Sequence, residues 1–527
     1  MKRSSVAIGL IVTSSLLVWL AGVVTATFDR ARATSEAFTP TFETVPCPRD
    51  VTKGIRNEVS CGYLKVPQDR SNPNGATIRV FFTTIQPPEG NPSPDPMFVA
   101  GSDLSWAWFD YAGVAPMAER THREVIIMDQ RGLGHSVPNL YCYELQWLKD
   151  PQLAPLGTRR METEFLEAVQ ACHDRLTDQG IDLGSYNLAE SAADAEDLRA
   201  ALGIQEWNLI TLGSASSISF EIMRRYPEHV RAAVFDSPAA PQVDLLTQAI
   251  VGTEYAFGQV ARACSTNPKC DRRWPHLRAT RDQALRRLRK QPSRFTAQGL
   301  HVLVDDATAV RVLRDALTWP ESLTNLPRDI YRLRTRGFGR GFGLFNPDIG
   351  VADRHLWATD PILGQGYVLP HSGHPVRRFN YGSFYSTFCH DEAPFVDRVA
   401  LVDAAQGKPW YMPAYVHSPY LQACERWDAG NANADPHDPL VSDIPTLILH
   451  GRFDPYSPLP LIKKAARTLS TSWVVEFPTL WHNILGSECG PEVRNGWIDD
   501  PTSPPDTSCV ADQSGIWFAM TPRGREP

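Results

Sequence analysis

The sequence predicts an α/β fold, in which a mostly parallel sheet is flanked by helices and interrupted by a large, mainly helical insertion. Short apolar runs alternate with helical segments between residues 78 and 235, which is typical of a parallel sheet covered on both faces. The alternation stops near residue 242 and resumes at residue 445. The chain has 527 residues, of which 43% are hydrophobic and 21% charged. That composition is globular and excludes a disordered protein.

The first part of the core is predicted over residues 27–241. Residues 78–85 alternate as a half-buried strand, and continuous apolar runs predict buried strands. A predicted helix ends at Gly203, a residue type that commonly follows the last helical turn. The predicted strands are 78–85, 96–100, 124–128, 207–212 and 230–235, and the predicted helices are 191–202 and 217–226.

The insertion is predicted over residues 242–435 as a helical cap. Helical pieces such as 282–289 alternate there with loops rich in aromatic residues, glycine and proline, for example at 337–345. Two further strands, at 445–450 and 473–477, place the last part of the core at residues 436–527. The chain is therefore expected to be one core interrupted by a cap.

The amino terminus predicts export. Lys2 and Arg3 precede residues 6–26, which contain no charged side chain. This pattern is typical of a signal peptide over residues 1–26, and its length also suits a membrane anchor through residues 6–26. Both interpretations place the body of the protein outside the cytoplasm. The formal net charge of −7, without a long Lys/Arg run, argues against nucleic acid as a partner.

The cysteines agree with an extracytoplasmic location. All ten follow the apolar segment, and an even count in an exported chain implies disulfides. We propose sequential pairing, although the sequence alone does not fix the connectivity. No cysteine or histidine cluster has zinc-ligand spacing, so no metal or cofactor is expected. The proposed pairs are Cys47–Cys61, Cys142–Cys172, Cys264–Cys270, Cys389–Cys424 and Cys489–Cys509.

The predicted strand, turn and helix of residues 207–226 resemble the nucleophile elbow of the α/β-hydrolase fold. The nucleophile of that fold lies on a sharp turn, with small residues two positions away on each side. Residues 211–215 read TLGSA, so Gly213 occupies the nucleophile position. Ser214 is an alternative nucleophile if the turn is shifted by one residue. An ordinary tight turn containing a glycine explains the segment equally well.

An acid and a base follow in the order that this fold requires. Asp454 comes shortly after the strand at 445–450, and His482 comes after the strand at 473–477. In this fold the acid that orients the histidine, and then the histidine itself, follow late core strands. A single Asp is more often a turn residue and a single His more often a surface or core residue. Their joint placement at successive strand ends favours a site.

The loop expected to stabilise a developing oxyanion is unusual. It follows the strand at 96–100 and contains Gly101, Ser102 and Asp103, while the main chain of Ser214 would supply a second donor. A carboxylate at Asp103 that pointed inward would repel the negative charge that such a loop stabilises. Pointing outward, the carboxylate would be harmless.

Several motifs together resemble the secreted tripeptidyl aminopeptidases and their proline-iminopeptidase-like relatives, over nearly all of the chain after the signal. The matching segments are 61–67 (CGYLKVP), 129–136 (DQRGLGHS), 225–230 (RYPEHV), 264–270 (CSTNPKC), 389–391 (CHD), 424–427 (CERW) and the C-terminal segment with Cys489 and Cys509. The resemblance implies an α/β-hydrolase fold and supports the sequential disulfides. It also implies release of short peptides from peptide amino termini by a Ser-Asp-His triad.

Carried over by motif, the family's acid falls on Asp454 and its base on His482, while its nucleophilic serine falls on Gly213. Its glycine-rich oxyanion loop falls on residues 100–103, where only Gly101 is kept. Three functions fit this pattern. The chain binds a peptide or small ligand in the former active-site cleft without hydrolysing it, or it uses Asp454 and His482 for acid–base chemistry, or it is a serine hydrolase that uses Ser214.

Overall fold

The computed structural model describes residues 38–88, 90–101, 111–146, 159–297, 300–318, 320–336, 380–513, 515, 516 and 518. The predicted segment 1–26, the membrane tether through 6–26, and Ser102 and Asp103 lie outside these residues. No helix within the described ranges is long and apolar enough to cross a membrane.

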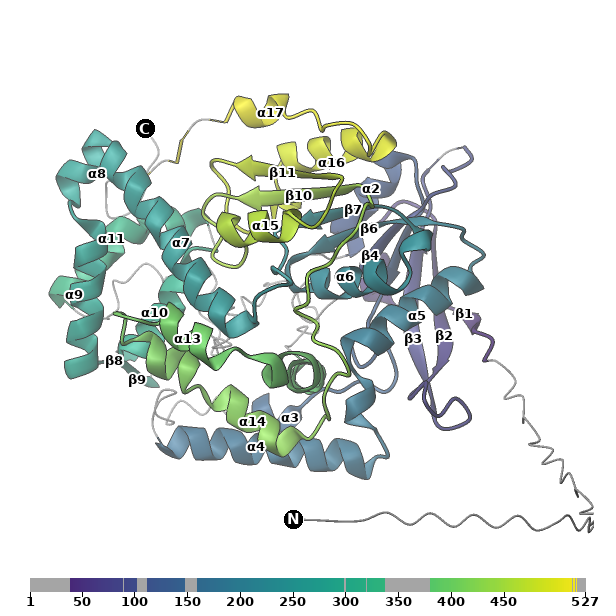
Figure 1. Ribbon diagram of the computed structural model, residues 1–527, viewed down its shortest axis with the longest axis horizontal. Coiled ribbons are helices and arrows are strands. Elements are labelled where there is room, and N and C mark those ends of the chain that lie inside the picture. Colours follow the sequence, from purple (N-terminus) through teal and green to yellow (C-terminus); the bar gives the residue numbers. More distant parts are fainter. Residues whose placement is uncertain are drawn as a thin grey trace, which may run out of the picture. The chain divides into compact units, whose positions relative to one another are not determined.

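A nine-stranded mixed sheet forms the core of the body that begins at Pro40 (Figure 1). Its order is β1-β2-β3-β5-β4-β6-β7-β10-β11. The pairs β1–β2, β2–β3 and β3–β5 are antiparallel, and all later neighbours are parallel. The mostly parallel sheet predicted from the sequence is therefore confirmed. The strands are β1 (Thr41–Val45), β2 (Val59–Pro67), β3 (Thr77–Ile85), β4 (Met97–Ala100), β5 (Val125–Met128), β6 (Trp207–Leu212), β7 (Val230–Asp236), β10 (Thr446–Gly451) and β11 (Ser472–Phe477).

Helices cover both faces of the parallel strands (Figure 1). Successive residues of a strand point to opposite faces. Val234 of β7 packs with residues of α2 and α16 in one cluster, whereas the ring of the adjacent Phe235 stacks on Phe220 of α6, with the centroids 4.5 Å apart. The helices outside the cap are α1 (Arg49–Thr52), α2 (Tyr111–Thr121), α5 (Leu188–Ala201), α6 (Ser216–Arg225), α15 (Leu459–Ala466), α16 (Cys489–Asp499) and α17 (Ser508–Ala511).

The segment between β7 and β10 is mainly helical, as the cap was predicted to be. It also contains a two-stranded antiparallel sheet, β8 (Ser293–Ala297) with β9 (Leu300–Val304), which the sequence analysis did not anticipate. The remaining elements are α7 (Leu245–Thr266), α8 (Pro268–Arg273), α9 (Leu277–Lys290), α10 (Asp306–Ala316), α11 (Pro320–Arg336), α12 (Tyr381–Thr387), η8 (Phe388–Glu392), α13 (Arg398–Ala404), η10 (Met412–Val416) and α14 (Pro419–Trp427).

Packing of the cap extends to residues ahead of its predicted boundary. Helices α3 (Tyr143–Gln146) and α4 (Arg159–Asp178) precede β6 in the chain, yet α4 packs along α14. The ring of Phe165 lies 5.5 Å from that of Tyr420. Helix α4 shares a hydrophobic cluster with the cap helices. The helices that pack together as the cap therefore include one that precedes residue 242 in the chain.

All ten cysteines are paired. The five disulfides join consecutive cysteines, which are the same pairs as those proposed from the sequence. Two of them, Cys264–Cys270 and Cys389–Cys424, lie within the cap segment. Five disulfides fit a protein that resides outside the reducing cytoplasm.

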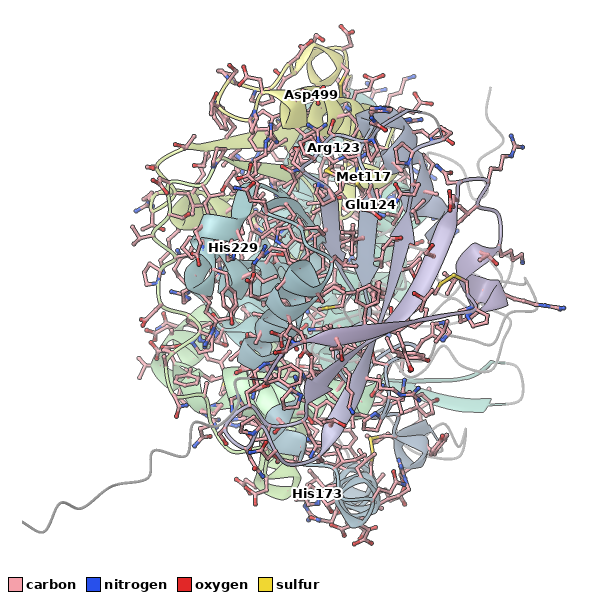
Figure 2. The ribbon with its side chains drawn as sticks, turned by 90° about the vertical axis from the view of Figure 1, so that its right-hand side faces the viewer. Met117, Arg123, Glu124, His173, His229 and Asp499 are labelled. Carbon is pink, nitrogen blue, oxygen red and sulfur yellow. A yellow bond between two sulfur atoms is a disulfide. The ribbon has the colours of Figure 1, made fainter. Side chains whose placement is uncertain are left out.

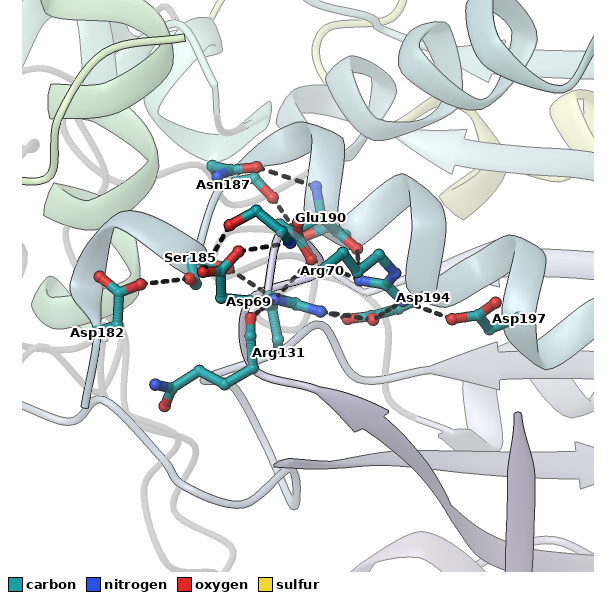
Figure 3. A network of polar contacts seen from close by, with 12 residues as sticks. Asp69, Arg70, Arg131, Asp182, Ser185, Asn187, Glu190, Asp194 and Asp197 are labelled. Atoms are coloured by element: carbon teal, nitrogen blue, oxygen red, sulfur yellow. Dashed lines mark hydrogen bonds and ion pairs between the residues drawn. The ribbon is translucent and has the colours of Figure 1, made fainter. Parts of the chain in front are cut away.

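An ion-pair network fixes the loop after β5 against α5 (Figure 3). The Arg131 guanidinium donates from Nε and Nη2 to the two carboxylate oxygens of Asp194, each at 2.7 Å. Arg70 binds the same carboxylate at 2.7 Å and also pairs with Glu190 and Asp197. Both Arg131 and Asp194 are buried, and Arg131 belongs to the DQRGLGHS motif. This part of the family resemblance therefore serves the scaffold.

A second polar cluster lies at the amino ends of the parallel strands. Arg123 donates to Asp95 at 2.9 Å and to Asp499 at 2.7 Å, and Figure 2 shows Arg123 beside Asp499. Asp95 also pairs with Arg231 and accepts a hydrogen bond from Asn208. The amino ends of β4, β5, β6 and β7 are thereby joined to α16. These contacts stabilise the amino edge of the parallel strands. The predicted site residues follow the opposite, carboxyl edge.

Candidate functional site

Three of the predicted site residues follow the carboxyl ends of parallel strands. Gly213 follows β6, Asp454 comes three residues after β10, and His482 comes five residues after β11. In open α/β sheets, ligands bind at this edge. The structure brings the three residues together.

Gly213 occupies the position that faces the histidine. Its φ angle is +58°, in the left-handed region that glycine adopts without steric cost. A Cβ atom at this position would lie 3.2 Å from Nε2 of His482 and 3.5 Å from Cε1. A side chain here would therefore reach the imidazole directly. The residue has no hydroxyl to present, and Ser214 is the next residue along the turn.

The turn is held by the first residue of α6. Oγ of Ser216 donates to the carbonyl of Gly213 at 2.6 Å and accepts from the main-chain N–H of Ala239 at 3.1 Å. Ser216 is fully buried, so its hydroxyl is committed to the scaffold.

His482 and Asp454 form a buried hydrogen-bonded pair. Nδ1 of His482 lies 3.0 Å from Oδ2 of Asp454, and the exposed fractions of the two residues are 4% and 0%. The other carboxylate oxygen accepts the N–H of Tyr456 at 2.7 Å. Nε2 is therefore the ring nitrogen that faces Gly213.

The charges of the pair stabilise each other. Burial by itself lowers the pKa of His482, but the charge and hydrogen bond of Asp454 outweigh it, so the pKa lies above its usual value. For Asp454, burial raises the pKa, while the charge and hydrogen bond of His482 bring it below the usual value. The arrangement favours an imidazolium next to a carboxylate.

The loop that carries His482 is anchored by Asp236. This fully buried carboxylate ends β7 and accepts the main-chain N–H groups of Ile484 at 2.9 Å and Leu485 at 2.7 Å. Burial raises the pKa of Asp236, against the hydrogen bonds from these two main-chain groups. Sequence reasoning missed this residue. The available signal was a carboxylate at the end of a continuous apolar strand.

A close approach of two loops also fixes the histidine. A Cβ atom on Gly451 would lie 1.9 Å from the carbonyl oxygen of Trp481, so only glycine fits at the end of β10. The N–H of Phe453 donates to the carbonyl of Leu480 at 3.1 Å. The acid loop and the base loop are thus joined through their main chains.

Two aromatic and cationic side chains complete the surroundings. The ring of Tyr456 lies 4.9 Å from the ring of His482, and the guanidinium of Arg314 lies 4.3 Å from the centre of the Tyr456 ring. Arg314 comes from α10 of the cap. Sequence reasoning gave neither residue a role. For Arg314 the reason is that nothing in a helical insertion indicates which turn will face the core, whereas Tyr456 lies only two residues after Asp454 and its proximity was a signal.

The predicted oxyanion loop is only partly described. Gly101 is buried, and its N–H donates to the carbonyl of Met128 at 3.0 Å. That donor therefore continues the hydrogen bonding of the sheet. Ser102 and Asp103 lie outside the described residues, and the roles predicted for them stay predictions.

Metal binding finds little support in the described ranges. One group of three side chains there has the spacing of metal ligands, namely Cys142, Glu144 and Cys172. The two cysteines are bonded to each other, and a metal requires free thiolates. These residues therefore act as a disulfide with a neighbouring carboxylate.

The sequence is similar to several hydrolases. Serine protease Hip1 of Mycobacterium tuberculosis is 22% identical over 541 residues, which cover 93% of this chain and 96% of that protein. Tripeptidyl aminopeptidase of Streptomyces coelicolor is 27% identical over 216 residues, or 38% of this chain and 39% of that protein. Carboxylesterase B of Mycobacterium tuberculosis is 27% identical over 224 residues, or 40% of this chain and 42% of that protein. The match to Carboxylesterase B thus spans about two fifths of its length.

A family model described as the alpha/beta hydrolase fold matches residues 98–485. This match includes the strands that carry the site and the whole cap segment. The chain belongs to the alpha/beta hydrolase family.

Proposed function

We propose that this chain is an exported member of the family that binds a peptide or a small molecule at the site of Gly213, Asp454 and His482 without hydrolysing it. One observation carries the proposal. The residue that faces Nε2 of His482 is Gly213, where an added Cβ atom would lie 3.2 Å from that nitrogen, and glycine has no nucleophilic side-chain atom. Covalent catalysis needs a hydroxyl or thiol within hydrogen-bond reach of the base.

The scaffold around the site supports binding. The Gly213 turn, the His482–Asp454 pair and the Asp236 anchor keep defined geometry and are buried. Similarity to tripeptidyl aminopeptidases makes a peptide the first ligand class to test. The five disulfides are in accord with export.

Binding and turnover are separated by one experiment. The purified protein is incubated with a defined mixture of synthetic peptides of three to six residues, and bound peptides are recovered by size exclusion and identified by mass spectrometry. We expect retained peptides of unchanged length. Shortened peptides whose production depends on Ser214 would contradict the proposal.

Acid–base catalysis is a second candidate, favoured by the intact pair of His482 and Asp454. A histidine next to a carboxylate can move protons without a covalent intermediate. Conversion of a ligand would then be lost in His482→Ala. Unchanged conversion by this variant would exclude the role.

A further inference from the structure

Helix α10 carries two buried arginines, of which Arg314 lies beside the site. Arg311 and Arg314 are 4% and 3% exposed. Residues three apart share one face of a helix, so both side chains leave α10 on the same side. Buried arginines normally pair with an acid or with carbonyl groups.

The contacts of Arg314 show what this side of α10 faces. The Arg314 guanidinium lies 4.3 Å from the centre of the Tyr456 ring, and that ring lies 4.9 Å from the ring of His482. Tyr456 follows Asp454 by two residues on the acid loop. The arginine-bearing face of α10 therefore borders the loops that carry the acid and the base.

Several buried polar atoms in this part of the cap make no hydrogen bond within the described residues, and two of them can donate to a ligand carboxylate. Nε of Arg311 and the hydroxyl of Tyr415 are buried and make no hydrogen bond within the described part of the chain. Arg311 also forms no ion pair with a described carboxylate. Tyr415 lies on η10, which packs against α10. Leaving a buried donor unpaired costs about 1–3 kcal/mol, and more for a charged group, so each such group requires an explanation.

We propose that this site recognises its ligand through a carboxylate group, held by Arg311 and Arg314 and completed by the hydroxyl of Tyr415. A carboxylate accepts up to four hydrogen bonds and matches the planar guanidinium. It would satisfy the Nε of Arg311 and the hydroxyl of Tyr415, and it would neutralise the charge of Arg311. Because Arg311 repels an ammonium group, the carboxyl end of a peptide fits this site better than its amino end. The inference rests on the proposed function, for which it specifies the class of ligand.

Two matched peptides test the inference in the full-length protein. Acetyl-Ala-Ala-Ala with a free carboxylate and the same peptide with a carboxyl-terminal amide differ only in the group at issue. By isothermal titration calorimetry we expect the acid to bind at least tenfold more tightly than the amide. Octanoate and octanamide form a second pair, which separates an apolar acid from a peptide as the source of the carboxylate.

Variants assign the preference to α10. Arg311→Gln should reduce the affinity for the acid about tenfold and leave the affinity for the amide unchanged, while Arg311→Lys should keep part of the preference. Arg286→Gln removes the same charge from an exposed position of α9 and serves as the matched control. The difference in affinity between acid and amide is measured on the unmodified protein, so this result does not depend on the folding of any variant.

The inference would be overturned if the acid and the amide bound equally well, or if none of the four compounds bound. Failure of the proposed function has a different signature, because it appears as Ser214-dependent shortening of the synthetic peptides with free amino ends, followed by mass spectrometry. Equal binding without cleavage would therefore contradict recognition of the carboxylate but would still agree with the proposed binding function.

Discussion

Nε2 of His482 lies 3.2 Å from the point where a Cβ atom of Gly213 would stand. The imidazole therefore faces the residue predicted to occupy the nucleophile position, and that residue carries no hydroxyl. The φ angle of +58° at Gly213 keeps the conformation of a tight elbow.

A serine at this position should become reactive. In Gly213→Ser, Oγ would be placed next to Nε2 of His482, and we expect labelling by a fluorophosphonate that the unmodified protein does not show. The left-handed conformation and the close contact should lower the free energy of unfolding by about 1–3 kcal/mol. Intact mass measures the labelling and urea unfolding measures the stability.

Two variants control for the gain of labelling in Gly213→Ser, namely Gly213→Ala and the double variant Gly213→Ser/His482→Ala. Alanine imposes the same backbone strain without a nucleophile, and removal of the imidazole removes the base. Labelling of either control would show that the adduct does not arise from a Ser–His pair at this site.

Asp236 should stabilise the loop that carries His482. Asp236→Ala removes the acceptor of two buried main-chain N–H groups, at 2.9 and 2.7 Å. The expected loss is about 2–4 kcal/mol in the free energy of unfolding, together with faster hydrogen exchange at Ile484 and Leu485. A loss below about 0.5 kcal/mol, the range of ordinary surface substitutions, would refute the anchoring role.

Asp454 should control the protonation of His482. Asp454→Asn leaves the burial, which lowers the pKa of the imidazole, and removes the carboxylate, which raises it. The pKa should therefore fall from above the usual value of about 6.5 to below it. Ring resonances of ¹³C-labelled histidine over a pH series provide the measurement. An unchanged pKa would mean that another group sets the charge of His482.

His437 should make stability depend on pH between about 6.5 and about 9. Burial lowers its pKa, but hydrogen bonds and charges of Glu392 and Asp435, each oxygen 3.0 Å from a ring nitrogen, raise it to about 9. Because the folded pKa exceeds the unfolded one, the contribution is complete below about 6.5 and is lost as the pH rises to about 9. Its size should be on the order of 2 kcal/mol.

Urea midpoints at pH 6 and pH 9 measure this contribution. In His437→Gln the difference between the two midpoints should shrink, because glutamine does not ionise and forms no pH-dependent ion pair with Glu392 and Asp435. An unchanged difference would place the pH dependence elsewhere in the chain.

The elements that carry the site were predictable because their patterns are local. Strand β6 has the predicted bounds, 207–212, and Gly203 follows its helix as expected. The chain order of Gly213, Asp454 and His482 then placed all three at the carboxyl edge. The order of strands in the sheet requires long-range pairing, which no local pattern encodes.

The parts of the site that sequence reasoning missed depend on tertiary contact. Asp236 resembles any residue at the end of a strand until two N–H groups from a loop 248 and 249 residues away reach it. Arg311 and Arg314 have the spacing of charged positions on an amphipathic helix, yet both are buried, and Arg314 lies over the ring of Tyr456. Only the fold shows that this face of α10 meets Tyr456.

Labelling of the unmodified protein with a fluorophosphonate, followed by intact mass and peptide mapping, decides whether this chain has a reactive serine. An active serine hydrolase treated in parallel verifies the reagent. We expect no adduct on this chain. A single adduct on Ser214, abolished in Ser214→Ala, would contradict this expectation and identify the protein as a working serine hydrolase.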